Sequence, residues 1–368
     1  MENNRIVVKF GTSTLTAGGQ QLSLPRVLDL VRQISTLNSR GCQVVLVSSG
    51  AIAAGKEALN YIELPRFIPA KQMLAAVGQP RLMGFYQQFF SIYGLSSAQV
   101  LLTRADLSDR RHYLNSRNTV DALLDHGIIP IINENDTVAT EEIRFGDNDY
   151  LSALVASLVE ADLLVLLTDQ PGLYTGDPRK DPMAHLIPEV TGPEIPEDLW
   201  QAAGGSSNGL GTGGMFTKLK AADLARRSGT LVYIASGSDP DILVHAAAGE
   251  PLGTRFPALI THLESRKRYL LTGGRSQGKI VVDDGAARAL AQGSSLLPVG
   301  VKKIQGQFDR GDTVRVLSPK GKEIAVGLVG YNSKDLEILL GRQSSEIETL
   351  LGYTFGDEVI HRNNLLLL

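Results

Sequence analysis

A glycine-rich stretch that ends in a lysine is the first feature that could do chemistry. Residues 209–218 read GLGTGGMFTK, and the backbone N–H groups of such a loop, together with the Lys218 ammonium, could hold phosphate oxygens. A Walker loop needs Gly directly before the lysine and Ser or Thr after it, whereas Thr217 and Leu219 flank Lys218. The dinucleotide fingerprint needs a preceding strand, and a loop-like segment precedes these glycines. A flexible surface loop is the alternative interpretation.

A second cation lies near the start of the chain. Lys9 belongs to a predicted strand at 6–10, and the small residues GTST follow at 11–14, so the backbone there can approach an anion closely. The alternatives are a lysine that reaches solvent or one in a structural ion pair. The predicted strand at 44–47 runs into small residues at 48–55, which open a helix whose N–H groups could also bind an anion.

Two polar clusters could bind a small charged molecule. NEND at 133–136 directly follows a predicted strand at 128–132, and DND at 147–149 stands at the start of a predicted helix. Such side chains could bind an ammonium and orient a carboxylate, or organise lysines or Mg²⁺ beside phosphate. Helix capping is the alternative for 147–149, but capping does not explain polar residues directly after a core strand.

Spacing argues against several other reaction classes. The six histidines form no pair with metal-ligand spacing, and no G-x-S-x-G nucleophile motif occurs. The predicted strand at 163–167 leads into Thr168 and Asp169, and the turn-rich loop that follows carries Tyr174, which could support a purine. The single cysteine, Cys42, stands beside a predicted strand and is interpreted as a small buried hydrophobe.

The elements that must position these residues alternate along the first two thirds of the chain. Nearly continuous apolar runs predict strands covered on both faces, and longer amphipathic stretches predict helices between them. The predicted strands are 6–10, 44–47, 97–102, 128–132, 163–167 and 231–235, and the predicted helices are 24–39, 70–91, 110–126, 147–160 and 215–228. We therefore expect an α/β three-layer sandwich with a mostly parallel central sheet. Ligands of such sheets bind beyond the carboxyl ends of the strands, where the polar residues fall.

A second, smaller domain is predicted toward the C-terminus. Short, turn-rich strands at 279–282, 313–316 and 323–327 indicate a β-rich fold. We expect a first domain at 1–265, a linker at 266–275 and the second domain at 276–368. Basic and acidic residues are nearly balanced in the second domain, which argues against RNA binding.

Composition sets the outer limits of these interpretations. The 368 residues are 43% hydrophobic and 20% charged, which is typical of a globular protein large enough for two domains. A net charge of -3 offers no general attraction to nucleic acid or to an anionic membrane. The start lacks a leader pattern and no long apolar run follows, so we expect a cytoplasmic protein without a membrane segment.

Six motifs, taken together and in order, resemble the amino acid kinase family. They are VVKFGTS, VSSGAIAAG, INENDTVA, FGDNDYLSALVA, LLTDQPGLYTGDP and GTGGMFTK. The C-terminal part resembles the PUA domain that certain members carry, so the resemblance covers nearly the whole chain. It is strongest to the members that act on glutamate. It implies ATP-dependent phosphorylation of the γ-carboxylate of L-glutamate, the first step toward proline, with inhibition by proline.

The resemblance also implies roles for individual residues. Lys9 and Lys218 would flank the phosphoryl group during transfer, and Asp147 or Asp149 would orient these lysines. The residues implied for glutamate are Ser49, Asn133, Asp136 and Asn148, with Asp136 on the α-ammonium. The residues implied for ATP are Lys9, Gly11, Thr168, Asp169, Thr212, Gly213, Gly214, Met215, Phe216, Thr217 and Lys218.

The partners that the resemblance implies are small molecules and other copies of the chain. Mg²⁺ would be held through the ATP phosphates and not by direct protein ligands. Proline would be an inhibitor, glutamyl phosphate reductase a functional partner, and the protein a homo-oligomer, with neither membrane nor RNA bound. The alternatives are family members that act on aspartate, N-acetylglutamate, carbamate or uridylate, and, from another class, an RNA-binding protein with a degenerate kinase domain.

Overall fold

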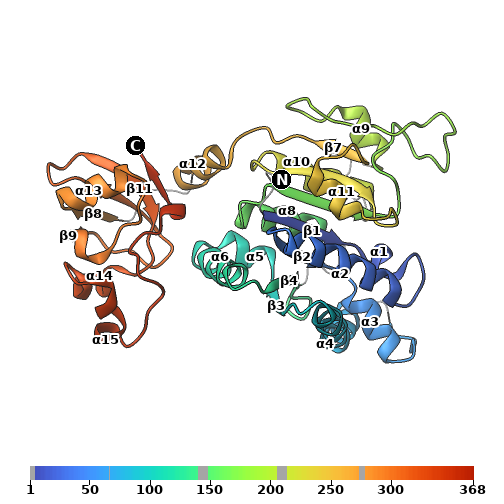
Figure 1. Cartoon of the computed structure of the whole chain (residues 1–368), viewed down its shortest axis with the longest axis horizontal. Helices are drawn as coiled ribbons and strands as arrows, with labels where there is room; N and C mark the ends of the chain where they lie inside the picture. The colour runs from blue at the N-terminus through green and yellow to red at the C-terminus, as the bar shows by residue number, and fades with distance from the viewer. Residues whose placement is uncertain (1–4, 66, 140–147, 205–213, 273–277) are drawn as a thin grey trace. The chain divides into compact units, whose positions relative to one another are not determined.

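The protein forms two compact units, each with its own sheet (Figure 1). The computed structural model describes residues 5–65, 67–139, 148–204, 214–272 and 278–368. One unit comprises the residues up to 107 with 116–262, and the other comprises 108–115 with 263–368. The domain boundaries expected at 1–265, 266–275 and 276–368 stay a prediction.

The sheet of the first unit has seven strands among the described residues, in the order β3-β4-β2-β1-β5-β6-β7. They are β1 (Arg5–Phe10), β2 (Gln43–Ser48), β3 (Ser97–Leu102), β4 (Ile129–Glu134), β5 (Leu163–Thr168), β6 (Leu231–Ser236) and β7 (Thr254–Phe256). Neighbouring strands pair in parallel, except that β6 and β7 are antiparallel. The predicted mostly parallel sheet is confirmed, and its carboxyl ends face one edge.

Helices cover both faces of this sheet. Side chains alternate between the faces of a strand, and the apolar residues Ile6, Val8 and Phe10 of β1 share one core with helices α2 (Leu24–Ser39) and α11 (Ile242–Ala248). Helices α8 (Asp149–Leu158) and α10 (Met215–Arg226) pack on each other, α8 against β1 and α10 against β6. Because Lys9 alternates with the apolar set, it points to the α8 side. The buried Cys42 belongs to the apolar core, as predicted.

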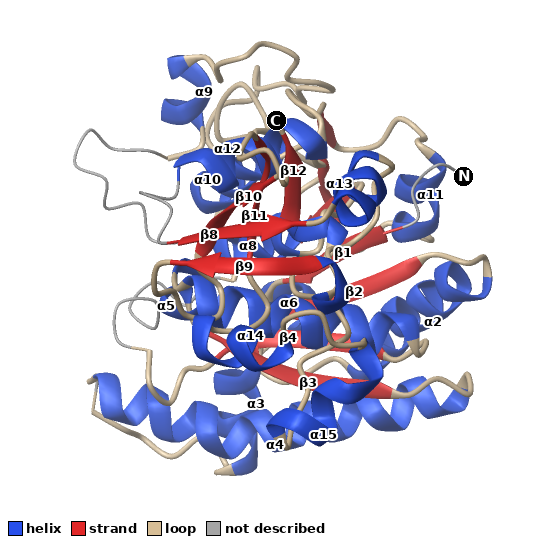
Figure 2. Cartoon of the chain, turned by 90° about the vertical axis from the view of Figure 1, so that its left-hand side faces the viewer, coloured by secondary structure: helices blue, strands red, loops and turns tan. Residues whose placement is uncertain are grey.

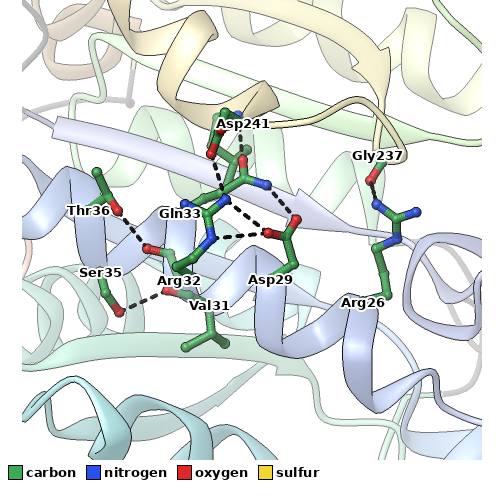
Figure 3. A network of polar contacts seen from close by, with 10 residues as sticks. Arg26, Asp29, Val31, Arg32, Gln33, Ser35, Thr36, Gly237 and Asp241 are labelled. Atoms are coloured by element: carbon green, nitrogen blue, oxygen red, sulfur yellow. Dashed lines mark hydrogen bonds and ion pairs between the residues drawn. The ribbon is translucent and has the colours of Figure 1, made fainter.

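A polar network ties α2 to the start of α11 (Figure 3). The Gln33 side chain is fully buried; its Nε2 donates to Asp29 Oδ2 at 2.9 Å, and its Oε1 accepts from the Leu243 N–H at 2.9 Å. Arg32 Nη2 donates to Asp29 at 2.9 Å and to Asp241 at 2.6 Å. A buried amide whose groups are satisfied in this way costs little and fixes one packing arrangement. The network therefore holds α2 on its face of the sheet.

Helices α3 (Ala51–Ala58) and α4 (Ile68–Ile92) touch through two glycines. A Cβ atom built on Gly78 would lie 1.8 Å from the carbonyl oxygen of Ala51, and one built on Gly55 would lie 1.9 Å from that of Leu74. Only hydrogen atoms fit at this distance, so the two backbones are in direct contact. Since α3 begins just after Ser49, this contact helps to fix the end of β2.

The structure corrects several element boundaries. Strand β4 continues through Asn133 and Glu134, which pair with Leu101 and Leu102 of β3, instead of ending at 132. The helix expected at 147–160 is described as Asp149–Leu158, and α10 ends two residues before 228. Helix α6 (Arg110–Asp125) lies close to its prediction, whereas the short helices α1 (Thr12–Thr16), α5 (Arg104–Ser108) and α9 (Glu197–Ala202) were not predicted. Helices of about five residues carry too few turns to show a periodic pattern.

The second unit is built on a five-stranded sheet in the order β12-β11-β10-β8-β9, counted over the described residues (Figure 2). Its strands are β8 (Gly278–Val282), β9 (Val301–Gln305), β10 (Thr313–Leu317), β11 (Glu323–Leu328) and β12 (Leu365–Leu367). Helices α12 (His262–Thr272), α13 (Asp284–Ala291), α14 (Ser333–Leu339) and α15 (Ile347–Leu351) complete it. The predicted β-rich fold is confirmed. The leucines near the C-terminus form strand β12, which pairs with β11.

No helix in the described part of the chain has both the length and the apolar character needed to cross a lipid bilayer.

The contact between α3 and α4 yields a stability prediction. Gly78→Ala should lower the free energy of unfolding by about 1–3 kcal/mol or prevent folding, because the added methyl group collides with the Ala51 carbonyl. Gly84→Ala is the matched control in the same helix, since a Cβ there meets nothing within 4 Å, and it should be neutral or stabilising by up to about 1 kcal/mol. Urea unfolding of both variants measures the difference, and equal effects would contradict the proposed close contact.

Candidate active site

A buried carboxylate lies between two lysines that are more than two hundred residues apart in the chain. Lys9 Nζ is 2.5 Å from Asp149 Oδ1, and Lys218 Nζ is 3.1 Å from Asp149 Oδ2. The Asp149 side chain is 0% exposed, and Lys9 and Lys218 are also buried. Two ammonium groups and one carboxylate leave this cluster with a net positive charge. The structure thus brings together three of the residues implied for catalysis.

Each member of the cluster is held by a different element of the first unit. Lys9 projects from β1 toward α8, and Asp149 is the first residue of α8, where the positive end of the helix dipole favours a carboxylate. Lys218 stands in the first turn of α10, which begins after Gly214. Gly214 has φ +93°, a left-handed conformation that suits glycine, so this residue sets the direction in which α10 leaves the preceding segment.

A cavity of about 630 Å³ opens in front of the two lysines. The predicted residues that line it are Lys9, Gly11, Ser49, Thr168, Asp169, Gly214, Met215 and Lys218. They come from the carboxyl ends of β1, β2 and β5 and from the start of α10. The cavity therefore lies at the edge of the sheet where parallel strands place their ligand sites.

The far part of the cavity is formed by the loop after β5. Tyr174, which was considered as a support for a purine, lines the cavity, and Leu173 is anchored by its N–H, which donates to Thr254 Oγ1 at 2.8 Å. Arg179 also lines the cavity and pairs with Asp177 at 2.9 Å; its hydrogen bonds lower the pKa of the Asp177 carboxyl. Sequence reasoning did not single out Arg179, although the adjacent basic residues in the GDPRK turn were a visible signal.

The two predicted asparagines form a buried amide network on the other side of the lysine cluster. Asn148 Nδ2 donates to Asn133 Oδ1 at 2.6 Å and to the Ser48 carbonyl at 2.7 Å. Asn133 Nδ2 donates to Gln79 Oε1 at 2.7 Å, so α4 supports the network. Gln79 was not predicted, because α4 carries several other polar residues and no local pattern distinguishes this one. The network fixes Asn133 and Asn148 relative to the end of β2.

Asp136 stands after β4 in a half-buried position. Burial raises the pKa of its carboxyl to about 6, and the positive charge of Lys71 opposes the shift. A carboxylate with a raised pKa binds a proton or another cation readily, because a cation restores the compensation that burial removes. The arrangement suits an ammonium ligand.

The remaining predicted residues are placed differently. Phe216 and Thr217 belong to the first turn of α10 but are not among the described residues that line the cavity. Phe216 packs edge-on against Trp200 with ring centroids 5.5 Å apart, and Thr217 Oγ1 donates to Asp149 at 2.8 Å. Asp147, Thr212 and Gly213 lie outside the described residues.

No group of three or more His, Cys, Asp or Glu side chains in the described part of the chain could hold a metal ion directly. The cavity wall carries the carboxylates of Asp169 and Asp177 near the lysines. This donor set fits a magnesium nucleotide, in which phosphate oxygens and water supply most of the ligands.

Comparison with known proteins identifies both parts of the chain. The family model described as "Amino acid kinase family" matches residues 4–236, and the model described as "PUA domain" matches residues 278–351. A structure titled as the UMP kinase from Bacillus anthracis covers 71% of this chain and 98% of its own, with a TM-score of 0.50 and 15% sequence identity. At that identity the likeness shows the fold alone.

Three curated relatives named "Glutamate 5-kinase" match almost end to end. The protein of Shewanella amazonensis is 53% identical over 99% of this chain and 96% of its own. That of Deinococcus radiodurans is 52% identical over 99% of this chain and 100% of its own. That of Klebsiella pneumoniae is 51% identical over 100% of this chain and 99% of its own.

Proposed function

The chain belongs to the amino acid kinase family, and we propose that it transfers the γ-phosphoryl group of ATP to the γ-carboxylate of L-glutamate. The observation that carries the proposal is the cluster of Lys9, Asp149 and Lys218, in which the two lysines line the cavity and the buried carboxylate pairs with both. Relatives that match the chain over nearly its whole length and are named "Glutamate 5-kinase" support glutamate over the other acceptors of the family. The product would be an acyl phosphate.

The reaction needs charge neutralisation more than it needs a base. The γ-carboxylate of glutamate has a pKa of about 4.3, so it is ionised at neutral pH and can attack without losing a proton. An anionic nucleophile and an anionic phosphoryl group repel each other, and positioned cations stabilise the charge of the transition state. Lys9 and Lys218 would flank the transferring group, and Asp149 would keep the two ammonium groups at a fixed separation.

ATP would occupy the part of the cavity formed by β5, the loop after it and the start of α10. Thr168, Asp169 and Tyr174 line that part, and Gly214 and Met215 stand where the N-terminal N–H groups of α10 are available to phosphate. The nucleotide would carry Mg²⁺ on its phosphates, which would supply charge neutralisation, and Asp169 is a carboxylate of the cavity lining that is compatible with this charge. The other ATP residues implied by the resemblance, Thr212, Gly213, Phe216 and Thr217 among them, stay predictions.

Glutamate would bind on the side of the amide network. Ser49 lines the cavity next to Lys9, and Asn133 and Asn148 are fixed behind the end of β2. Asp136 would accept the α-ammonium, because burial gives its carboxylate a strong preference for a cation. The asparagines and Asp136 would orient the α-amino acid end, and the two lysines would face the γ-carboxylate. This arrangement would select an acidic amino acid of the length of glutamate.

The lysine cluster also favours catalysis over the RNA-binding alternative. An intact pair of buried lysines around a buried carboxylate is costly to maintain unless the site uses it.

The product of the proposed reaction is a reactive acyl phosphate, which would be passed on quickly. Glutamyl phosphate reductase therefore remains the proposed functional partner, and the cytoplasm remains the proposed location.

The first prediction of the proposal concerns Lys218. Lys218→Ala should lower kcat by roughly 10²–10³, because one preorganised cation is removed from the transition state. Lys220→Ala is the matched control, an exposed lysine on the same helix, and it should keep normal turnover. Glutamate-dependent ADP release, with hydroxylamine to trap the acyl phosphate, measures both. Near-normal turnover of Lys218→Ala, or no reaction of the unaltered protein with glutamate, would contradict the proposed function.

Proline inhibition rests on the resemblance alone. The same assay with and without proline decides it.

The raised pKa of Asp136 predicts how glutamate use depends on pH. Above pH 6 the carboxylate is ionised and binds the α-ammonium; below it the neutral acid cannot, so kcat/KM for glutamate should fall as pH decreases through about 6. Asp136→Asn should have kcat/KM for glutamate lower by about 10- to 100-fold at pH 8, with the acid limb near pH 6 removed, and KM for ATP little changed.

Unfolding is the control for this variant. The raised pKa of Asp136 means that folding disfavours its charged form. At pH 8 the carboxylate is charged in both the folded and the unfolded state, so it lowers the free energy of unfolding there. Asp136→Asn should therefore be no less stable than the unaltered protein at pH 8. Equal losses in KM for glutamate and ATP would remove Asp136 from the proposed role.

We also propose that the protein is a homo-oligomer in which a second copy covers α4. This helix buries apolar residues on its inner side and also exposes Met73, Val77 and Ile92, and exposed apolar side chains of this size on one helix favour a contact with another surface. Met73→Glu with Val77→Glu should reduce the sedimenting mass, whereas Met183→Glu, at an exposed methionine in a loop, should not. An unaltered protein that sediments as a monomer would contradict the proposal.

A further inference from the structure

We propose that Thr217 is a positioning residue, whose hydroxyl holds the Asp149 carboxylate in the orientation that the two lysines need. The inference rests on the proposed phosphoryl transfer and assigns to the Thr217 side chain a role that differs from contact with the nucleotide. Thr217 Oγ1 lies 2.8 Å from Asp149 Oδ2, the oxygen that Lys218 Nζ approaches to 3.1 Å. The hydroxyl and the ammonium therefore converge on one carboxylate oxygen.

Two acceptors among the described residues lie within reach of the Thr217 hydroxyl, which has one hydrogen to donate. Besides Asp149 Oδ2, the carbonyl oxygen of Gly214 lies at 3.0 Å, three residues back in the first turn of α10. A hydrogen bond to a carboxylate is shorter and stronger than one to a neutral carbonyl. Since the Asp149 carboxylate is also fully buried, it gains more from a donor than a solvated group would. The geometry favours donation to Asp149.

The position of Thr217 separates its side chain from the cavity. Gly214, Met215 and Lys218 line the cavity, whereas Thr217 is on the side of α10 that packs on α8 and is not among the described lining residues. The backbone of this first turn can therefore face phosphate while the Thr217 side chain serves Asp149. The first turn of α10 links the Thr217–Asp149 contact to the cavity lining, because Thr217 and Lys218 are adjacent in the chain.

The Thr217 hydroxyl gives Asp149 a hydrogen-bond donor that stays in place during the reaction, which the lysines cannot do. Lys9 and Lys218 have long, flexible side chains, and both would be drawn toward phosphoryl oxygens as charge develops there. The Thr217 hydroxyl would then stay in place as a donor to Asp149 Oδ2. Threonine in a helix has two preferred χ1 rotamers, and in the one seen here the Thr217 hydroxyl lies within reach of both the Gly214 carbonyl and Asp149, which favours that rotamer. Without it, the carboxylate could rotate and the separation of the two ammonium groups would change.

The test compares two substitutions of Thr217 that differ in the hydroxyl. Thr217→Val keeps the branched shape and removes the hydroxyl; kcat should fall about 10- to 100-fold, with KM for ATP and for glutamate within about threefold of the unaltered protein. Thr217→Ser restores the hydroxyl and should recover kcat to within about threefold. Thr36→Val is the matched control, a half-buried helical threonine of α2 whose hydroxyl donates to the Arg32 carbonyl at 3.0 Å, and it should leave kcat unchanged.

Three results would overturn the inference. One is an unchanged kcat in Thr217→Val, a second is a loss that falls mainly on KM for ATP, which would make the side chain a nucleotide ligand, and a third is an equal loss in the serine variant. Changes that act through one contact are not additive, so Thr217→Val should have little further effect on kcat when Asp149 is already Asn.

A second measurement keeps the inference separate from the proposed function. Thermal unfolding of the Thr217→Val, Asp149→Asn and double variants should show the same coupling, with the valine substitution destabilising only while Asp149 is present. An unaltered protein that is inactive with glutamate would remove the proposed function, and the unfolding coupling would still decide whether Thr217 holds Asp149. Additive unfolding effects would overturn the inference whatever the acceptor.

Discussion

The buried ion cluster of Asp149 with Lys9 and Lys218 is the interaction on which the rest of the structure depends. Two ammonium groups cannot lie close together inside a protein without a counter-charge, and a buried carboxylate needs donors on both oxygens. Each member therefore requires the other two, and the cluster forms only when β1, α8 and α10 are all in place. Its net positive charge beside the cavity suits a phosphoryl group, which is the role proposed for it, and burial would strengthen that interaction.

The architecture supplies three fixed directions for this cluster. The alternation of side chains in β1 sends Lys9 to the α8 face while its neighbours Val8 and Phe10 enter the opposite core. The starts of α8 and α10 bring Asp149 and Lys218 to the same place. On the other face, the network of Gln33 with α11 and the glycine contact of α3 with α4 hold the helices that support the strand ends. Both helix layers therefore contribute contacts that position the site.

The two sides of the lysine cluster differ in their polar chemistry, which gives the proposed substrates their order. On the cavity side, the loop after β5 and the start of α10 offer an aromatic ring, backbone donors and cations, which suit a nucleotide. The fixed amides of Asn133 and Asn148 and the Asp136 carboxylate, which are not among the described lining residues of the cavity, suit an α-amino acid. The lysines stand between the two sides, where a phosphoryl group would cross. A magnesium ion carried by the nucleotide would need little from the protein in such a site.

The sequence by itself determined the first six strands of the larger sheet, its mostly parallel order and the family, because apolar runs and ordered motifs are local patterns. It did not show the short strands β7, β9 and β12, which carry too few residues for a clear pattern. It did not determine that β4 continues through Asn133, since pairing with β3 sets that end. The choice among pairing partners was also beyond it: Lys9 could have reached solvent instead of Asp149, and the contact of the Thr217 hydroxyl with Asp149 has no signal in the sequence. Gln79, which contacts Asn133, and Arg179, which lines the cavity, were not predicted. Only the tertiary structure decided these points, because each depends on contacts between segments far apart in the chain, which no local pattern records.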